Sequence, residues 1–253
     1  MLRFLDALAF SGLWVATAAP VLAAAAARAF GGEPDPVALA FAFAGTYAVY
    51  GLDRLRDRAS DTDSAPIRSA FVARHRGALL AATALSGAAA AVCAFALGPR
   101  GLGIAAVAGG VGALHRKLKR RIPVKGVYIA AIWLLVVLGC ASIGTAPARS
   151  AIAWSAAILG TALFANAIAF TARDREGIVA RVGRRQAIAA AVGWSTLGSL
   201  VALTAAPPAL RALGAIPIAT LLALVRIRFD ERYAPFVVDG ALIAGGLVAC
   251  WVG

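Results

Sequence analysis

The chain has 253 residues, of which 61% are hydrophobic and 15% are charged, and its mean hydropathy is +0.82. Soluble domains are about a quarter charged, so this composition excludes a soluble protein and predicts one integral membrane domain over residues 1–253. The apolar windows are rich in Ala, Gly, Leu and Val without strict alternation, which favours helices over an outer-membrane barrel. The net charge of +13 accompanies no nucleic-acid motif, so nucleic acid is not an expected partner.

Apolar windows along the chain predict nine transmembrane helices and therefore an all-α membrane bundle. We expect the helices at residues 4–27, 37–52, 78–97, 102–114, 126–143, 151–171, 187–205, 209–225 and 236–252. Pro20 is the expected site of a kink in the first helix. The connections at residues 53–76, 115–125 and 226–233, and the connection between the sixth and seventh helices with its charged cluster at residues 173–177, are expected to be charged loops.

The basic residues fall mainly on one side of this predicted bundle. Of the 25 Lys and Arg residues, 21 lie on the side of the N-terminus, and the other side has Arg28, Arg100, Arg149 and Arg211. The positive-inside rule therefore predicts a protein of the inner (cytoplasmic) membrane with a cytoplasmic N-terminus and an external C-terminus.

The end of the second predicted helix carries an unusual run of polar residues. Thr46, Tyr50, Asp53 and Asp57 follow one face of the helix, and the two carboxylates lie one turn apart at the cytoplasmic surface. Hard oxygen ligands at this spacing suit Mg²⁺. The alternative is a solvated helix end with surface ion pairs, but ionisable groups at a membrane bundle favour a functional site.

The end of the sixth predicted helix repeats this arrangement with Asn166, Phe170 and Asp174 at successive turns. An interhelical hydrogen bond is an equally good explanation of Asn166. Two acidic helix ends and four basic loops on one face suit a diphosphate that is held by Mg²⁺ and by Arg or Lys side chains.

The two acidic segments resemble the motifs of the UbiA superfamily of intramembrane prenyltransferases. The family's first motif, N-D-x-x-D-x-x-x-D, aligns with residues 49–57, where Asp53 and Asp57 keep the last two acids and Val49 and Tyr50 replace the first two polar residues. The second motif, D-x-R-D-x-x-G-D, aligns with residues 171–178, which keep Arg173, Asp174 and Gly177. Residues 119–125 also resemble the basic loop before the family's fifth helix.

This resemblance implies a nine-helix fold and a Mg²⁺-dependent transfer of a prenyl group from an allylic prenyl diphosphate to a lipophilic, possibly aromatic, acceptor. It implies three groups of site residues. Mg²⁺ and catalysis depend on Asp53, Asp57 and Asp174; the diphosphate is bound by Lys119, Arg120, Lys125 and Arg173; the substrate pocket contains Tyr50, Asn166 and Phe170. The membrane lipid surrounds this site, and the oligomeric state is unknown from the sequence.

Three other functions remain to be weighed. A UbiA-related protein that binds a prenyl lipid or a partner without catalysis is suggested by the three motif acids that this sequence lacks. A transporter would place its charged residues near mid-membrane rather than at one surface. A CDP-alcohol phosphotransferase would carry a D-G-x-x-A-R pattern, which is absent from the sequence.

Overall fold

A computed structural model describes residues 2–56, 65–121, 125–174 and 179–253, and helices make up almost all of these ranges. The first half contains α1 (Leu2–Ser11), α2 (Leu13–Ala29), α3 (Pro36–Arg56), α5 (Pro66–Arg74), α6 (Arg76–Ala96) and α7 (Gly98–Arg121). The second half contains α8 (Lys125–Ala141), α9 (Arg149–Asp174), α10 (Val179–Val182), α11 (Arg184–Leu200), η1 (Val201–Ala205), η2 (Pro208–Gly214), α12 (Ala215–Val225), η3 (Ala234–Val238) and α13 (Asp239–Val252).

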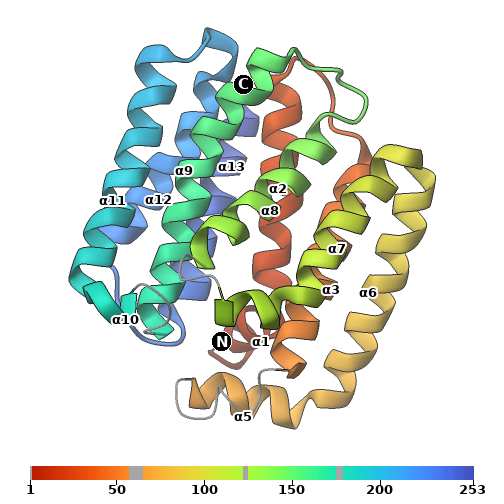
Figure 1. The fold of residues 1–253 in the computed structure, drawn as a ribbon, viewed down its shortest axis with the longest axis vertical. Coiled ribbons are helices and arrows are strands. Elements are labelled where there is room, and N and C mark those ends of the chain that lie inside the picture. The colour runs from red at the N-terminus through yellow and green to blue at the C-terminus, as the bar shows by residue number, and fades with distance from the viewer. Residues whose placement is uncertain (1, 57–64, 122–124, 175–178) are drawn as a thin grey trace.

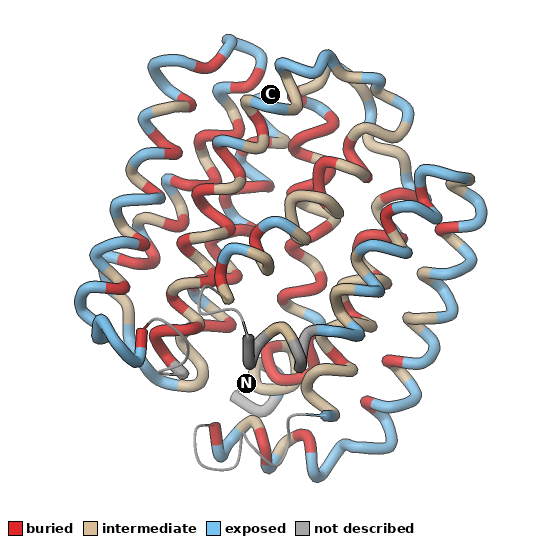
Figure 2. Tube along the Cα trace, viewed as in Figure 1, coloured by how far each residue is buried: buried red, intermediate tan, exposed pale blue. Residues whose placement is uncertain are grey.

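The long helices stand side by side as a bundle, and the two termini lie toward opposite ends of it (Figure 1). Buried residues concentrate on the central helices, whereas α6 and α11 at the two flanks carry many exposed positions (Figure 2). The exposed positions of α6 include large apolar side chains such as Leu85, Val92 and Phe95. An apolar exposed surface of this kind suits contact with lipid.

Helix α2 lies at the centre of the bundle because its side chains are small. Ala16, Ala18, Ala19 and Ala23 are completely buried, and Leu22 between them is buried as well. Alanine allows neighbouring helix backbones to approach closely, which strengthens packing inside a membrane where the hydrophobic effect does not drive helix association. Helix α2 contacts α3, α8 and α13, and so holds together the elements that surround the site described below.

The all-helical fold is confirmed, but several predicted boundaries are wrong. The predicted first helix is divided at Gly12, where a φ of 93° ends α1 and the axis bends by 65°; Pro20 instead lies within continuous α2. The segment 53–76, expected to be a loop, contains α5, which begins with Pro66 at a position where proline's missing N–H is harmless. Helix α7 continues to Arg121 through the expected loop 115–125, because Lys and Arg are good helix formers.

Within the described ranges, five helices are long and apolar enough to cross a membrane, or six if the bent pair α1 and α2 forms one span. They support a multi-pass membrane protein. The predicted count of nine spans is not confirmed, and the orientation of the termini stays a prediction.

Candidate functional site

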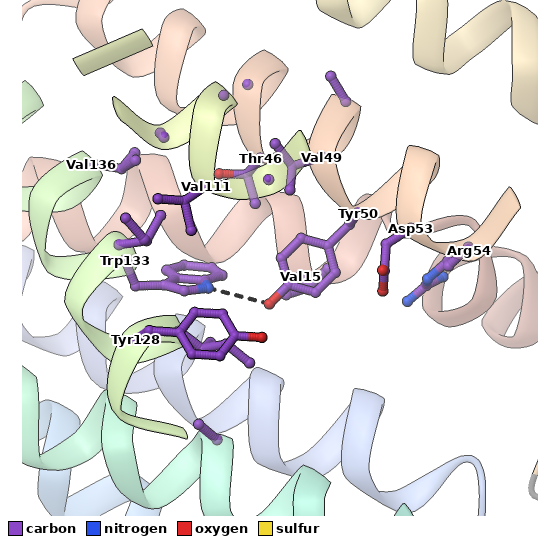
Figure 3. A pocket seen from close by; sticks show the side chains of 18 of the residues that line it. Val15, Thr46, Val49, Tyr50, Asp53, Arg54, Val111, Tyr128, Trp133 and Val136 are labelled. Carbon is purple, nitrogen blue, oxygen red and sulfur yellow. Dashed lines mark hydrogen bonds between the residues drawn. The ribbon is translucent and has the colours of Figure 1, made fainter. Parts of the chain in front are cut away.

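A cavity of about 480 Å³ opens among α3, α6, α7, α8 and α9. Figure 3 shows part of its wall, with aromatic side chains of α3 and α8 facing one another. Helix α3 lines the cavity from Phe41 to Arg54. At 1.5 Å of rise per residue this stretch is about 20 Å long, so the cavity is elongated along the bundle.

One part of the cavity is apolar and is lined by small side chains. These are Gly45, Ala48, Gly87, Ala90, Ala91, Ala105, Ala108, Gly109 and Gly112, from α3, α6 and α7. A Cβ added to Gly112 would lie 3.2 Å from the methyl groups of Val49, so the glycine permits the close approach of α7 to α3. Small residues on facing helices leave room for a long apolar chain between them.

The other end of the cavity is charged. Asp53, Arg54, Arg68, Lys125, Arg173 and Asp239 all line it. Four cationic side chains therefore face two carboxylates among the described residues. A concave site with excess positive charge and low-dielectric walls attracts an anion.

The side chain of Arg54 is held in position by the C-terminal end of α1. Gly12 adopts a left-handed conformation that ends α1, and Arg54 donates a hydrogen bond of 2.8 Å from Nη1 to the carbonyl oxygen of Ala9 in its last turn. A cation at a helix C-terminus also interacts favourably with the helix dipole. The break at Gly12 thus fixes a charged residue at the polar end of the cavity.

The end of α9 is fixed in a similar way. Arg184 donates two hydrogen bonds to backbone carbonyl oxygens: one of 3.0 Å from Nε to Ala172, and one of 2.9 Å from Nη2 to Arg173. Arg173 is 8% exposed, and its guanidinium lies 5.2 Å from the centre of the Phe170 ring. This contact has cation–π geometry, which orients Arg173 at the cavity.

Tyr50 occupies the position where the family motif has its first acid. Its hydroxyl accepts a hydrogen bond of 3.2 Å from Nε1 of Trp133, and the two rings meet edge to face at 6.3 Å (Figure 3). An aromatic pair with this geometry stabilises the wall beyond the area that it buries. The aromatic wall thus stands between the apolar and the charged parts of the cavity.

Asn166 and Asp239 meet across the bundle at the polar end. Nδ2 of Asn166 on α9 donates a hydrogen bond of 3.0 Å to Oδ1 of Asp239 at the start of α13, and Asp239 is 4% exposed. The interhelical hydrogen bond that was an alternative explanation of Asn166 is therefore present. Both residues also line the cavity.

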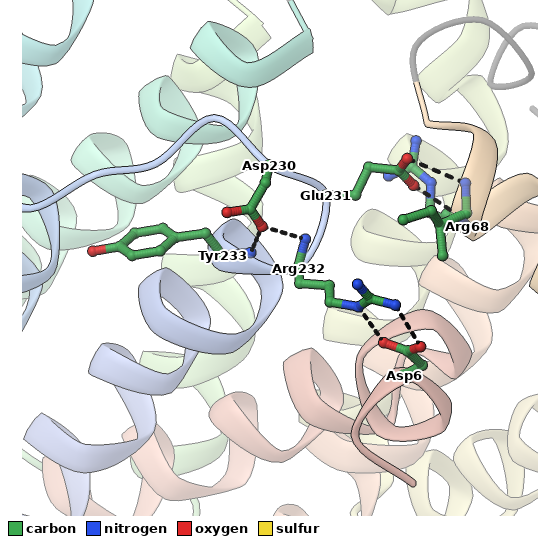
Figure 4. A network of polar contacts seen from close by, with 7 residues as sticks. Asp6, Arg68, Asp230, Glu231, Arg232 and Tyr233 are labelled. Atoms are coloured by element: carbon green, nitrogen blue, oxygen red, sulfur yellow. Dashed lines mark hydrogen bonds and ion pairs between the residues drawn. The ribbon is translucent and has the colours of Figure 1, made fainter. Parts of the chain in front are cut away.

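A network of polar contacts joins α1, α5 and the loop before η3 (Figure 4). The carboxylate of Glu231 accepts hydrogen bonds from the backbone N–H groups of Ile67 and Arg68, at 3.1 and 2.9 Å, at the start of α5. Arg232 forms a two-pronged ion pair with Asp6, at 2.7 and 3.0 Å, and this hydrogen bonding raises the pKa of the Arg232 guanidinium. The network ties α1 and α5, which carries Arg68, to the last loop.

The structure brings six of the predicted site residues to one cavity. They are Tyr50, Asp53, Lys125, Asn166, Phe170 and Arg173. Asp57 and the side chains of Asp174, Lys119 and Arg120 lie outside the described residues. In the described part of the chain, no three acidic, His or Cys side chains come together as a metal site. The roles assigned to these residues stay predictions.

The cavity residues that sequence reasoning missed include Arg54, Arg68, Trp133 and Asp239. A usable signal existed for Asp239, since it is an acid inside the last apolar window, and ionisable residues within membrane segments are usually functional. Arg54 was counted among the loop charges. Trp133 lies in a uniformly apolar helix, where nothing in the sequence separates a cavity residue from a lipid-facing one.

Comparisons with known proteins agree with this architecture. No protein-family model matches the chain, and no curated protein matches it. The fold is similar to the apo structure of a UbiA homolog from Aeropyrum pernix K1, with a TM-score of 0.65 over 92% of this chain and 97% of that chain, at 15% sequence identity. The chain therefore has the all-helical membrane fold of that UbiA homolog, which is the fold class that the sequence predicted.

Proposed function

We propose that the protein is a UbiA-like membrane prenyltransferase, which moves a prenyl group from an allylic prenyl diphosphate to a lipophilic acceptor in a Mg²⁺-dependent reaction. The observation that supports it best is the cavity itself, where an end rich in cations continues into a channel of small apolar residues. A prenyl diphosphate has this same division into a polyanionic head and an apolar chain. The fold shared with a UbiA homolog makes the proposal specific.

The cations at the polar end would bind the diphosphate. Lys125 and Arg173 line the cavity, and Arg54 and Arg68 add to the positive charge there. Charge-assisted hydrogen bonds to phosphate are about twice as strong as neutral ones, and Arg can make two of them in parallel. We include Lys119 and Arg120 in this role because α7, on which they lie, leads toward Lys125.

Asp53, Asp57 and Asp174 are the proposed Mg²⁺ ligands. Asp53 lines the cavity beside the cations, and α9 ends at Asp174, directly after the cavity residue Arg173. Carboxylate oxygens are the donors that Mg²⁺ prefers, and Asp53 offers one at the diphosphate end, which supports this assignment. The bound ion would neutralise negative charge on the departing diphosphate.

The rest of the cavity would protect the reactive chain. Cleavage of the donor's C–O bond leaves an allylic cation, and the electron pair leaves with the diphosphate. Tyr50, Trp133 and Phe170 present aromatic rings at the junction of the two parts, where ring faces stabilise a cation. The apolar walls exclude water, which would otherwise capture the cation as an alcohol.

Asp53→Asn tests the proposal. We expect Mg²⁺-dependent diphosphate release from geranylgeranyl diphosphate to fall at least about 100-fold, because the variant removes a carboxylate that stabilises the leaving group. Asp35→Asn is the matched control: Asp35 caps α3 at its other end through the N–H of Ala38, and Asn caps a helix equally well. Unchanged turnover of Asp53→Asn, with both variants folded in the membrane, would refute the assignment.

A non-catalytic protein that binds prenyl lipids is the second candidate. It is favoured by one observation: Tyr50, which replaces a motif acid, is engaged with Trp133 and forms part of the cavity wall instead of offering a carboxylate. Binding of prenyl diphosphates without turnover, across a panel of donors and acceptors, would support this candidate over the enzyme.

A further inference from the structure

Asp239 is a buried acid that the proposed diphosphate and Mg²⁺ chemistry does not use. It is 4% exposed, belongs to the membrane segment Ala234–Val252, and lines the cavity. A buried ionisable group in a membrane helix costs several kcal/mol unless its partners compensate. Its presence therefore needs a reason beyond packing.

One hydrogen bond and two nearby cations, Arg54 and Arg173, offset part of this cost. Oδ1 accepts one hydrogen bond, from the neutral amide of Asn166. Among the described residues, Asp239 forms no ion pair, and its Oδ2 accepts no hydrogen bond. The ionisable groups that face it are Tyr50 and Arg54 on α3 and Arg173 on α9. A carboxylate with one oxygen engaged and the other open to a cavity points to a ligand.

The local backbone supports the same conclusion. Asp239 follows η3, a π-helical turn that contains Pro235. Nε1 of Trp14 donates a hydrogen bond of 3.3 Å to the carbonyl oxygen of Phe236 within that turn. Single π turns in helices occur frequently at functional sites because they shift the register of the residues after them. Here the shifted register starts at Asp239.

We propose that Asp239 is the catalytic base on the acceptor side, which binds the hydroxyl group of a phenolic acceptor through Oδ2 and takes its proton. The inference rests on the proposed prenyl transfer. In this step the electron pair of the phenolic oxygen forms the new bond to C1 of the prenyl cation, and the O–H proton passes to Asp239. The diphosphate has already left with the electrons of the broken C–O bond, so the step is balanced without another reactant.

Asp239 also selects the kind of acceptor group. A carboxylate oxygen only accepts hydrogen bonds, so the acceptor group at this point is an O–H donor. The cations Arg54 and Arg173 at the same end then stabilise the phenolate character that develops as the proton leaves.

Asp239→Asn tests the inference because it keeps the volume and a hydrogen bond to Asn166 but removes the base. Two activities are measured with reconstituted full-length protein: diphosphate release from geranylgeranyl diphosphate without acceptor, in which water in the vacant acceptor position captures the prenyl cation, and transfer to phenol or to the more acidic 4-cyanophenol. We expect transfer to phenol to fall at least about 100-fold more than diphosphate release does, as for other general bases. The loss should be clearly smaller for 4-cyanophenol, whose proton leaves more easily. Asp35→Asn again serves as the control.

Each contrary result has a distinct meaning. Wild-type kcat and KM for phenol in Asp239→Asn, or an equal loss with both phenols, would overturn the role as base. Diphosphate release by the wild type without transfer to either phenol would overturn the acceptor class and leave the donor chemistry standing. No release from any prenyl diphosphate by the wild type would overturn the proposed function, and this inference with it.

Discussion

Gly109→Leu should shorten the prenyl chain that the protein accepts. Gly109 lines the apolar part of the cavity, and a Cβ added there meets no described atom within 4 Å, so a leucine side chain can enter the cavity without distorting α7. The four carbons of that side chain occupy space that four carbons of the donor would fill. At about 0.8 kcal/mol for each buried carbon, the longest accepted donor loses about 3 kcal/mol, or about 200-fold in affinity.

The assay compares the Kd and KM of geranyl, farnesyl and geranylgeranyl diphosphate for the variant and the wild type. The loss should appear for the longest donor and fall to about twofold or less for the shortest. Gly110→Leu is the matched control, because Gly110 is the next residue of α7, also has open space around its Cβ and does not line the cavity. A loss that is independent of chain length, or an equal loss in Gly110→Leu, would refute the placement of the chain.

Two further predictions concern stability. In Gly51→Ala, the new Cβ would overlap Oγ1 of Thr83 and lie 3.3 Å from its Cβ, so we expect a loss of about 1–3 kcal/mol in thermal unfolding in detergent. Adding Thr83→Ala should restore most of the lost stability, because Oγ1 of Thr83 is buried without a hydrogen-bond partner among the described residues and its removal costs little. A double variant that is no more stable than Gly51→Ala would contradict this packing. Glu231→Gln removes the negative charge that caps α5, which should cost about 1 kcal/mol of local stability. Hydrogen exchange of the α5 amides should therefore become about fivefold faster. Unchanged exchange would show that Glu231 does not hold α5.

The sequence predicted the class of fold well because membrane helices have a simple signature. A bilayer needs about 20 apolar residues for each span, and hydropathy reports this directly. The division at Gly12 was missed because proline is the usual breaker of membrane helices, whereas here a glycine with positive φ ends α1 and leaves Pro20 in a continuous helix. Helix α5 was missed because its polar composition is typical of a loop. The residue that caps its first turn, Glu231, is far away in the sequence, so the local sequence does not reveal the helix.

The candidate site was predictable where one helix face carries the signal. Tyr50 and Asp53 share a face of α3, and Asn166 and Phe170 lie one turn apart on α9, so helical periodicity predicted these two pairs. Arg173 was predicted by the motif resemblance alone. The hydrogen bond between Asn166 and Asp239 spans 73 positions of sequence. No periodicity within one segment reports such a pair, since it depends on how α13 packs beside α9.

The ion pair between Asp6 and Arg232 joins residues 226 positions apart and has a consequence for biogenesis. At synthesis rates of about 5–20 residues per second, Arg232 leaves the ribosome roughly 10–45 s after Asp6. During that interval α1 lacks the two contacts that hold it, first the hydrogen bond from Arg54 to the carbonyl of Ala9 and then the ion pair with Arg232. Helix α1 is thus among the last elements to be fixed in place, so a nascent chain truncated before Arg232 should leave α1 open to proteases.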